Sequence, residues 1–489
     1  MMPQVLRSNA ICTALKWSRK PLPSYKTPLV TQFQRPENRN VANQRRWHTQ
    51  NTKPRLSPST ASSNAVSRSG ESAQPDFLDP KYFKDLLETN AAVSLGRWED
   101  YHPVLLRDCC TCASCVDPFS KQKNFQTTDI PENIEPIAVE KTADGLTQLH
   151  WINDIPGWGR SHVTTLPADF EKKISSPVTV LDAHYHLKKR IYWDKNKIAK
   201  NFRYFNYEDY MKNDNALFSL LRILNIYGLV ILRGVPDTEI AVADIASRIG
   251  TIRDTFYGRT WDVKSKPNAK NVAYTSKFLG LHMDLLYMTN PPGLQFLHCL
   301  KNTCEGGSSI FSDSWKAAAK DLSAKDQEIL TQLEIPYHYE NAGEHYYFRH
   351  PVIEMGLESG SKWDPADDAG IRQVNYSPPF QDMHHPRGQD TIESTLLFGE
   401  GLGALRKFAA AVESEENLFE YMLQEGECVI FNNRRVLHGR RQFDAGGGER
   451  WLRGTYVDTD VMMSRFRVLS EKSEDASHPA VYGEYVNNP

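Results

Sequence analysis

Residues 429–439 read VIFNNRRVLHG, an apolar run followed by polar residues and then by His438 and a glycine. The run predicts a buried strand that leads toward the histidine. Much earlier in the chain, residues 281–284 read LHMD. Because side chains two apart on a strand point to the same face, we expect His282 and Asp284 to bind one metal ion, with His438 as the third ligand. Two imidazoles and one carboxylate leave three positions of an octahedral iron(II) open, as an oxygenase needs.

An isolated His-x-Asp is weak evidence, and the alternative is ordinary surface or core residues. The residues after His438 strengthen the iron prediction. Residues 450–457, RWLRGTYV, predict a strand that carries Arg450 and Arg453. An enzyme that uses 2-oxoglutarate needs an arginine just after the distal histidine, because a planar guanidinium can hold the far carboxylate by two hydrogen bonds. Both arginines are candidates from the sequence.

Length and composition are typical of a globular enzyme with two or three domains. The chain has 489 residues, of which 40% are hydrophobic and 24% charged. No apolar run reaches the length of a membrane span, so none is predicted. The net charge is -2, yet residues 1–70 hold twelve Lys or Arg and a single acid, Glu37. The rest of the chain is therefore strongly acidic, which argues against nucleic acid as a partner.

The basic N-terminal segment resembles a mitochondrial presequence. Met1–Lys20 can form a short basic amphipathic helix, Arg45–Trp47 suits processing, and residues 57–75 read as a serine-rich linker. We therefore assign residues 1–75 to a presequence and a disordered linker, and expect the protein in the mitochondrial matrix. The alternative is a basic tail that carries no address.

Four of the eight cysteines, Cys109, Cys110, Cys112 and Cys115, lie within seven residues. This spacing is too tight for an ordinary disulfide framework and is typical of metal binding. A fourth ligand is needed, and the next histidines are His150 and His162. A zinc ion held by four protein ligands would be structural, because no position stays open for chemistry. The alternative is a set of buried or redox-sensitive thiols.

The apolar pattern predicts a mainly β fold with flanking helices, of the α+β class. It indicates a double-stranded β-helix, or jelly roll, because short apolar runs alternate with Gly, Pro and Asn turns. We expect a small zinc-binding domain over residues 76–180 and the catalytic domain over 200–475. The expected helices are 216–224, 237–249 with Asp237 as N-cap, 314–335 and 402–425; the expected strands are 227–235, 293–300, 306–311 and 371–376.

Several motifs together resemble the gamma-butyrobetaine dioxygenase family of Fe(II)/2-oxoglutarate enzymes, which includes trimethyllysine dioxygenase. The resemblance runs from about Asp76 to the C-terminal region. It is carried by LRDCCTCASC (106–115), TFYGRTW (255–261), NVAYT (271–275), HMD (282–284), PGLQFLHC (292–299) and VLHGR (436–440). It implies a jelly-roll catalytic domain behind a small zinc domain, and a homodimer.

The resemblance also implies a role for each matching residue. The implied iron ligands are His282, Asp284 and His438, and Arg450 is the implied ligand of 2-oxoglutarate. The implied ligands of a structural zinc are Cys110, Cys112, Cys115 and His162, which leaves Cys109 as an extra thiol. His162 is preferred over His150 because residues 161–164 lie where the family's ligand does.

Four aromatic residues occupy the places of the family's aromatic cage: Tyr257, Trp261, Tyr274 and Tyr456. Such a cage suits a trimethylammonium group, which cannot donate a hydrogen bond and is attracted to ring faces. The plain alternative is that Tyr257 and Trp261, four apart, form a core stripe of a helix, and that the other two are ordinary strand residues.

The implied reaction is the hydroxylation of gamma-butyrobetaine to carnitine with 2-oxoglutarate and O2; a requirement for ascorbate stays open. Alternatives are trimethyllysine dioxygenase, a related dioxygenase of different substrate, and a non-catalytic mitochondrial binding or regulatory protein. Two departures from the family pattern bear on the choice. Ser377-Pro378 replaces the usual Asn-Asn that reads the substrate's polar end, and Asn432–Arg434 replaces Asp-Asn-Trp, which is expected to alter how His438 is oriented.

Overall fold

The computed structural model describes residues 101–159, 161–166, 170, 190–264, 275–356, 371–383 and 391–472. The predicted presequence and linker at residues 1–75 lie outside these ranges. Tyr274 lies outside them as well. Within the described ranges, every helix is too short or too polar to traverse a lipid bilayer.

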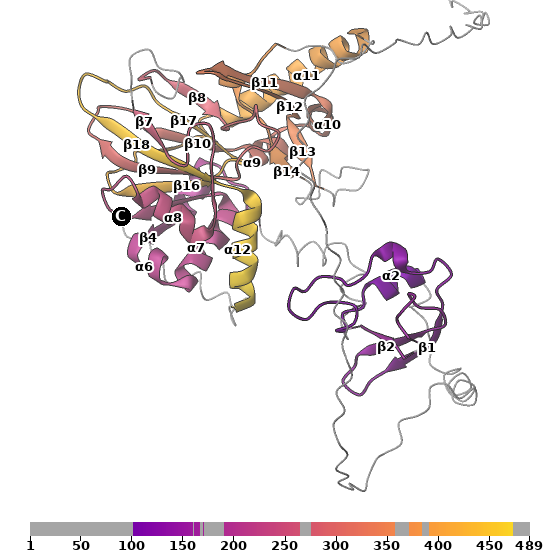
Figure 1. Cartoon of the computed structure of the whole chain (residues 1–489). Helices are drawn as coiled ribbons and strands as arrows, with labels where there is room; N and C mark the ends of the chain where they lie inside the picture. Colours follow the sequence, from indigo (N-terminus) through magenta and orange to yellow (C-terminus); the bar gives the residue numbers. More distant parts are fainter. Residues whose placement is uncertain are drawn as a thin grey trace, which may run out of the picture. The chain divides into compact units, whose positions relative to one another are not determined.

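Residues 101–170 form a small body around the cysteine cluster (Figure 1). It contains α2 (Pro103–Asp108), the 3-10 turn η3 (Thr127–Asp129) and an antiparallel sheet of β1 (Pro136–Lys141), β2 (Thr147–Trp151) and β3 (Val163–Leu166). Alternate side chains of β2 point inward, so Leu149 and Trp151 pack with Leu106, Phe125 and Leu166. These side chains form the apolar core of the small body.

The larger sheet of residues 190–472 has seven strands. Its order is β4 (Tyr204–Asn206), β5 (Leu229–Arg233), β16 (Glu427–Asn432), β9 (Leu294–Asn302), β18 (Arg450–Val457) and β6 (Ile252–Arg253), with β7 (Trp261–Lys264) also paired to β18. Only the β4–β5 pair is parallel among these described strands. Its central strands are apolar on both faces, so both faces of the sheet are covered.

A smaller sheet lies against the inner face of the larger one. Its order is β15 (Phe419–Tyr421), β10 (Ser309–Asp313), β17 (Val436–Arg440) and β8 (Leu279–His282). The two sheets share one core, in which the rings of Phe311 and Phe431 meet edge to face with centroids 5.7 Å apart. This pair of sheets agrees with the predicted jelly roll and with the mixed α and β composition.

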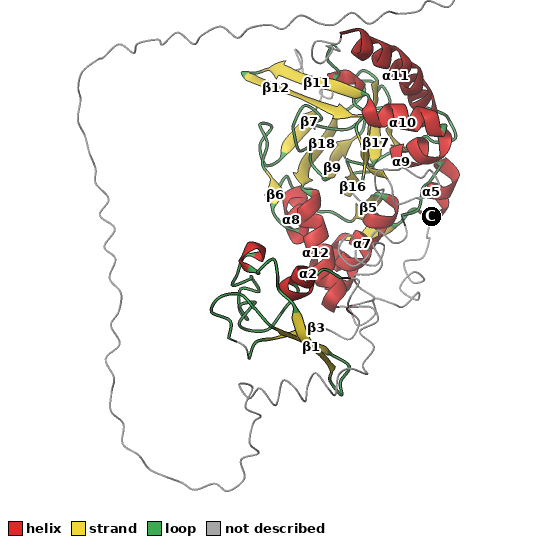
Figure 2. Cartoon of the chain, turned by 90° about the vertical axis from the view of Figure 1, so that its right-hand side faces the viewer, coloured by secondary structure: helices red, strands yellow, loops and turns green. Residues whose placement is uncertain are grey.

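Three helices cover the outer face of the larger sheet: α7 (Asp214–Tyr227), α8 (Ala241–Ile249) and α12 (Thr459–Lys472) (Figures 1 and 2). Two short helices, α5 (Lys195–Asn201) and α6 (Tyr207–Lys212), precede them. The prediction of a helix at 216–224 is confirmed, and α7 ends at Gly228, whose φ of 77° suits glycine. The prediction of Asp237 as an N-cap is wrong, because α8 begins four residues later and the Asp237 carboxylate lies 3.5 Å from Lys301 Nζ.

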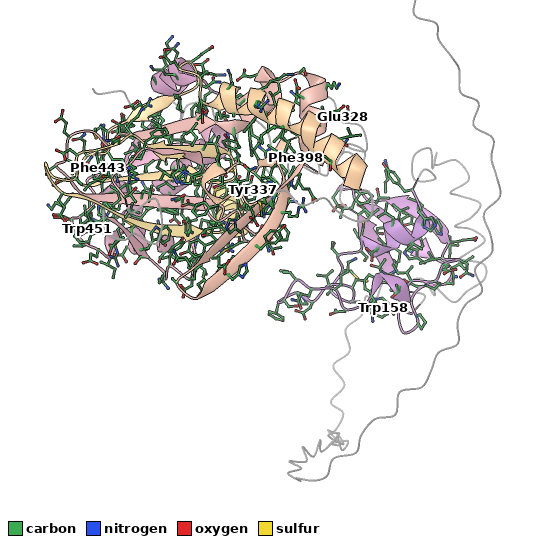
Figure 3. All side chains as sticks on the ribbon, turned by 90° about the horizontal axis from the view of Figure 1, so that it is seen from above. Trp158, Glu328, Tyr337, Phe398, Phe443 and Trp451 are labelled. Atoms are coloured by element: carbon green, nitrogen blue, oxygen red, sulfur yellow. The ribbon has the colours of Figure 1, made fainter. Side chains whose placement is uncertain are left out.

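A long insertion between β10 and β15 packs beside the sheets (Figure 2). Its strands are β11 (Glu334–Asn341), β12 (Glu344–Pro351), β13 (Ile353–Met355) and β14 (Ile371–Val374), and its helical segments are α9 (Ser314–Lys316), the π-helical η5 (Ala317–Asp321), α10 (Ala324–Gln332), the 3-10 turn η7 (Pro378–Phe380) and α11 (Thr391–Val412). Tyr337, labelled in Figure 3, is 2% exposed and its hydroxyl donates to the Asn375 carbonyl oxygen at 3.1 Å.

Both predicted helical insertions are wrong in part. The segment 314–335 is broken at Leu322, because Ser323 caps a new helix through its hydroxyl oxygen, and from Glu334 the chain forms a strand. The segment 402–425 ends its helix at Val412, after which residues 419–421 pair with β10. Four expected strands correspond to observed ones. Each expected range contains all or most of β5, β9, β10 or β14; the ranges are 227–235, 293–300, 306–311 and 371–376.

Candidate active site

The two histidines among the predicted metal ligands come from adjacent strands of the smaller sheet. His282 is the last residue of β8, and His438 on β17 lies directly opposite it, with ring centroids 4.2 Å apart. The expectation that Asp284 continues the strand is wrong, because β8 ends at His282. Asp284 lies in the following turn, where Leu285 has a φ of 63°. The turn brings the Asp284 carboxylate back toward both histidines.

The Asp284 carboxylate lies between the two imidazoles and is held from several sides. Its Oδ1 is 3.3 Å from His282 Nε2 and 3.9 Å from His438 Nε2. The Asn433 side chain accepts from the Asp284 backbone N–H at 2.8 Å and donates to its carbonyl oxygen at 3.1 Å. The Tyr456 hydroxyl donates to Asp284 Oδ2 at 2.7 Å. The three candidate ligand atoms lie within 4.8 Å of one another, which one metal ion can bridge.

The protonation states of these groups suit a metal ion. Burial lowers the pKa of His438 to about 3, so its imidazole is neutral near pH 7. Burial by itself would raise the pKa of Asp284, but its hydrogen bond with His282 holds that pKa well below the usual range. His282 Nδ1 lies 2.9 Å from the Gly280 carbonyl oxygen, so Nδ1 is a donor and Nε2 is the ring nitrogen that would bind a metal ion. Two imidazoles and one carboxylate fit iron(II).

Three of the four predicted cage residues line the pocket that contains these ligands: Tyr257, Trp261 and Tyr456. The Trp261 and Tyr456 rings are stacked, with centroids 4.1 Å apart, and the Tyr257 ring lies 6.4 Å from Trp261. Tyr257 is in a turn and Trp261 begins β7, so the alternative of a helical core stripe is wrong. The structure therefore brings three aromatic faces together beside the candidate ligands.

The two candidate arginines of β18 have different surroundings. Arg450 lines the pocket and is 6% exposed, and its Nε has no hydrogen-bond partner among the described residues. No ion pair joins it to a carboxylate of the described residues. Arg453 Nη1, in contrast, lies 2.7 Å from Asp262 Oδ1 and 2.7 Å from Glu239 Oε2. Of these two arginines of β18, Arg450 is therefore the one that offers a guanidinium to an anion in this pocket.

Sequence reasoning missed several residues of the pocket wall. The rings of Tyr287 and Phe380 lie 5.3 Å apart, and both line the pocket. Gln295 on β9 is 2% exposed, and its Oε1 has no hydrogen-bond partner within the described ranges. Arg440 also lines the pocket, and its Nη2 donates to the Thr275 carbonyl oxygen at 2.7 Å. Three features of the sequence could have pointed to these residues. Gln295 lies in the motif PGLQFLHC, Arg440 lies in the motif VLHGR, and Phe380 follows the departure at Ser377-Pro378.

The departure at Asn432–Arg434 acts elsewhere than predicted. Among the described residues, no side chain of this segment is hydrogen-bonded to the His438 ring. Arg434 instead donates from Nε to Gln373 Oε1 at 3.1 Å and also bonds to Asn375. Asn375 in turn donates to Glu354 Oε1 at 2.8 Å. Arg434 thus belongs to a buried polar network on β13, β14 and the segment after β14, while its neighbour Asn433 holds the backbone of Asp284.

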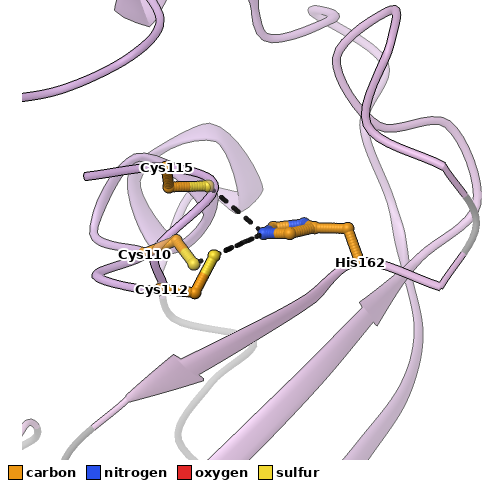
Figure 4. A group of neighbouring side chains, drawn as sticks. All are labelled: Cys110, Cys112, Cys115 and His162. Carbon is orange, nitrogen blue, oxygen red and sulfur yellow. Dashed lines mark hydrogen bonds between the residues drawn. The ribbon is translucent and has the colours of Figure 1, made fainter. Parts of the chain in front are cut away.

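The cysteine cluster forms a second group of candidate metal ligands (Figure 4). His162 Nε2 lies 3.5 Å from Cys110 Sγ, 3.4 Å from Cys112 Sγ and 3.2 Å from Cys115 Sγ. Asp154 Oδ2 accepts from His162 Nδ1 at 2.6 Å, which turns Nε2 toward the sulfurs. Three sulfurs and one nitrogen within 4.8 Å of one another fit a tetrahedral zinc ion.

Two other residues that the sequence offered for this cluster lie outside it. His150 is on β2, and its Nε2 has no hydrogen-bond partner. Cys109 is the C-cap of α2. Neither belongs to the group of four ligand atoms, so the geometry separates His162 from the alternative that the spacing left open.

Comparisons with known proteins agree with this geometry. Residues 186–456 match the taurine catabolism dioxygenase TauD, TfdA family, and residues 93–156 match the gamma-butyrobetaine hydroxylase-like N-terminal family. The chain is 40% identical to dioxygenase str8 of Strobilurus tenacellus, over 74% of this chain and 84% of that protein. It is 32% identical to gamma-butyrobetaine dioxygenase of Pseudomonas sp. (strain AK-1), over 76% and 91%. It is 28% identical to mitochondrial trimethyllysine dioxygenase of Bos taurus, over 79% and 86%.

Proposed function

The chain belongs to the TauD, TfdA family and is an Fe(II)/2-oxoglutarate-dependent dioxygenase. We propose that its substrate is a trimethylammonium compound, foremost gamma-butyrobetaine, which it hydroxylates. The observation that carries the proposal is the pocket in which Tyr257, Trp261 and Tyr456 lie beside the candidate metal ligands. Each ring face would contribute about 0.5 to 2 kcal/mol to binding of a quaternary ammonium. The similarity to gamma-butyrobetaine dioxygenases supports the same substrate.

We assign the iron to His282, Asp284 and His438, and the far carboxylate of 2-oxoglutarate to Arg450. Iron held there would supply the redox chemistry by which dioxygen oxidises 2-oxoglutarate to succinate and carbon dioxide, with one oxygen atom entering succinate and the other the substrate. The neutral His438 imidazole and the ionised Asp284 carboxylate need no proton change before they bind a cation. The buried Arg450 guanidinium would be paired once the co-substrate carboxylate enters.

The protein's remaining task is to orient the substrate. A cation held by Tyr257, Trp261 and Tyr456 would fix one end of the substrate, so the length of its chain decides which methylene faces the metal ligands. Tyr287 and Phe380 add apolar surface that excludes water from the same pocket. Gamma-butyrobetaine and trimethyllysine share the cationic end and differ at the other, so the cage by itself does not separate them.

A second candidate is a dioxygenase of the same family that acts on a different acceptor. Two observations favour it. Ser377-Pro378 stands where the family reads the polar end of the substrate. Ser377 is 1% exposed, and its hydroxyl has no hydrogen-bond partner in the part of the chain that the structure describes. The identity to dioxygenase str8, at 40%, also exceeds the 32% identity to the bacterial gamma-butyrobetaine dioxygenase.

The test is succinate formation by the Fe(II)-loaded full chain with 2-oxoglutarate and O2, recorded together with product mass. We expect succinate to be coupled to a hydroxylated product with gamma-butyrobetaine. The matched control is its neutral isostere, in which a tert-butyl group replaces trimethylammonium. The isostere keeps the shape and loses the charge, so its KM should rise by about tenfold or more if two or three ring faces contribute. If succinate formation were coupled to hydroxylation of trimethyllysine alone, trimethyllysine would be the substrate. If succinate formed but neither compound were hydroxylated, the second candidate would be favoured.

We also propose that Cys110, Cys112, Cys115 and His162 bind a structural zinc ion. Removing the zinc is expected to unfold residues 101–170, since such sites contribute on the order of 10 kcal/mol to the folding of small domains. Cys112→Ser should therefore lose bound zinc and make this region sensitive to protease. Cys109→Ser is the matched control, because Cys109 lies outside the ligand group. Zinc content measured by mass spectrometry checks both variants; one zinc per chain retained in Cys112→Ser would contradict the assignment.

A further inference from the structure

One aromatic residue of the pocket contacts both the cage and the candidate metal ligands. Tyr456 on β18 is 2% exposed, and its hydroxyl donates to Asp284 Oδ2 at 2.7 Å. The face of the same ring stacks on Trp261, with 27° between the ring planes. Among the described side chains, Tyr456 is the aromatic residue of the pocket whose hydroxyl is hydrogen-bonded to Asp284. Tyr456 is therefore placed to influence how that carboxylate meets a metal ion.

The two oxygens of Asp284 have different partners. Oδ1 faces His282 Nε2 and His438 Nε2 at 3.3 Å and 3.9 Å, while Oδ2 accepts the phenolic hydrogen of Tyr456. The backbone of Asp284 is already fixed on both sides by Asn433. The main motion left to the Asp284 carboxylate is then rotation about its side-chain bonds. The hydrogen bond from Tyr456 to Oδ2 restricts this rotation.

The position of the Tyr456 ring is itself fixed by its neighbours. Gly454, two residues earlier on the same strand, lies beneath Trp261, and a Cβ at Gly454 would come within 2.7 Å of the Trp261 ring. The absence of a side chain there lets Trp261 lie close to β18 and stack on Tyr456. A tyrosine phenol is protonated at neutral pH, so the Tyr456 hydroxyl is the donor in its hydrogen bond to the Asp284 carboxylate.

We propose that Tyr456 is a positioning residue which makes Asp284 a ligand through Oδ1 alone. A carboxylate that binds through both oxygens would occupy two coordination positions. With Oδ2 held by Tyr456, Asp284 occupies one, which preserves the positions that a bidentate co-substrate and dioxygen require. This inference rests on the proposed iron site. It gives Tyr456 a second role, because in the aromatic cage only the face of its ring would be used and its hydroxyl would have no function.

The test is Tyr456→Phe in the full chain, with Tyr257→Phe as the matched control. Phenylalanine keeps the ring and removes only the hydroxyl, and the Tyr257 hydroxyl is 3.4 Å from that of Tyr287 and not bonded to Asp284 in the described structure. The cysteine cluster is first filled with zinc, so that added Co(II) reports the other site. The readouts are anaerobic titration with Co(II), which reports metal affinity, and the visible absorption of bound Co(II), which reports coordination number. Gamma-butyrobetaine binding is measured separately by calorimetry.

We expect Tyr456→Phe to weaken Co(II) binding by about ten- to a hundredfold and to change the absorption intensity, as for other residues that orient a metal ligand. The affinity for gamma-butyrobetaine should change by less than about twofold, because the ring face is kept. Unchanged Co(II) affinity and spectrum in Tyr456→Phe, or equal losses in both variants, would overturn the inference. A protein that does not bind gamma-butyrobetaine would contradict the proposed substrate, while the Co(II) result would still decide the role of Tyr456.

Discussion

Replacing His282 with alanine in the full chain is expected to abolish succinate formation from 2-oxoglutarate. The change removes one of the two imidazoles that flank Asp284 Oδ1, and two remaining side chains would hold the metal ion loosely and in the wrong geometry. The packing cost should be small, since His282 ends its strand and the neighbouring Leu281 and Met283 stay in place. Succinate formation and bound iron are both measured on purified protein.

The control for this change is His338→Ala. The His338 side chain is 43% exposed on β11, with Nδ1 3.5 Å from an Asp382 carboxylate oxygen, and it does not line the pocket. Its removal should leave turnover unaltered. If His282→Ala consumed 2-oxoglutarate at the rate of the unchanged protein, the iron assignment would be refuted. Bound iron without any turnover in the unchanged protein would instead favour a binding or regulatory role for the same scaffold.

The parts of the fold that the sequence predicts well are those where local pattern and tertiary packing agree. The strand at 429–431 and the helix at 216–224 are apolar on the faces that the sheet buries, so their patterns survive in the structure. The helix expected at 402–425 fails because pairing with β10 outweighs helix formation at residues 419–421. A window of sequence contains no information about that partner strand.

The candidate site shows the same limit at the level of single residues. The motif pairs His282 with Asp284 correctly, although the strand that was expected to align them ends at His282. Arg450 and Arg453 are equivalent in a sequence, and only the ion pairs of Arg453 on β18 distinguish them. The partners of Arg434 come from β14 and from the segment that follows it, some sixty residues away along the chain. No spacing rule predicts contacts of that kind.

The second large effect is expected from Arg450→Gln, which should raise the KM for 2-oxoglutarate. The Arg450 guanidinium lines the pocket with no carboxylate partner in the described structure, so we assign its charge to the co-substrate. Truncating one partner of a buried charge pair costs about 2 to 5 kcal/mol, which corresponds to roughly thirtyfold to several thousandfold in affinity. Arg450→Lys should give a smaller increase, because an ammonium keeps the charge and loses the two parallel hydrogen bonds.

Arg453→Gln is the matched control, since Arg453 lies three residues further along the same strand and is already paired with Asp262 and Glu239. Its KM for 2-oxoglutarate should stay within about twofold, and any cost should appear as a lower melting temperature, because exposed ion pairs contribute up to about 1 kcal/mol. If the KM for 2-oxoglutarate were unchanged in Arg450→Gln, the far carboxylate of 2-oxoglutarate would be assigned to Arg440, the other arginine of the pocket wall. Equal increases in Arg450→Gln and Arg453→Gln would mean that the two substitutions disturb β18 as a whole. The assignment therefore depends on the difference between two arginines of one strand, of which one faces the pocket and the other is bound to carboxylates.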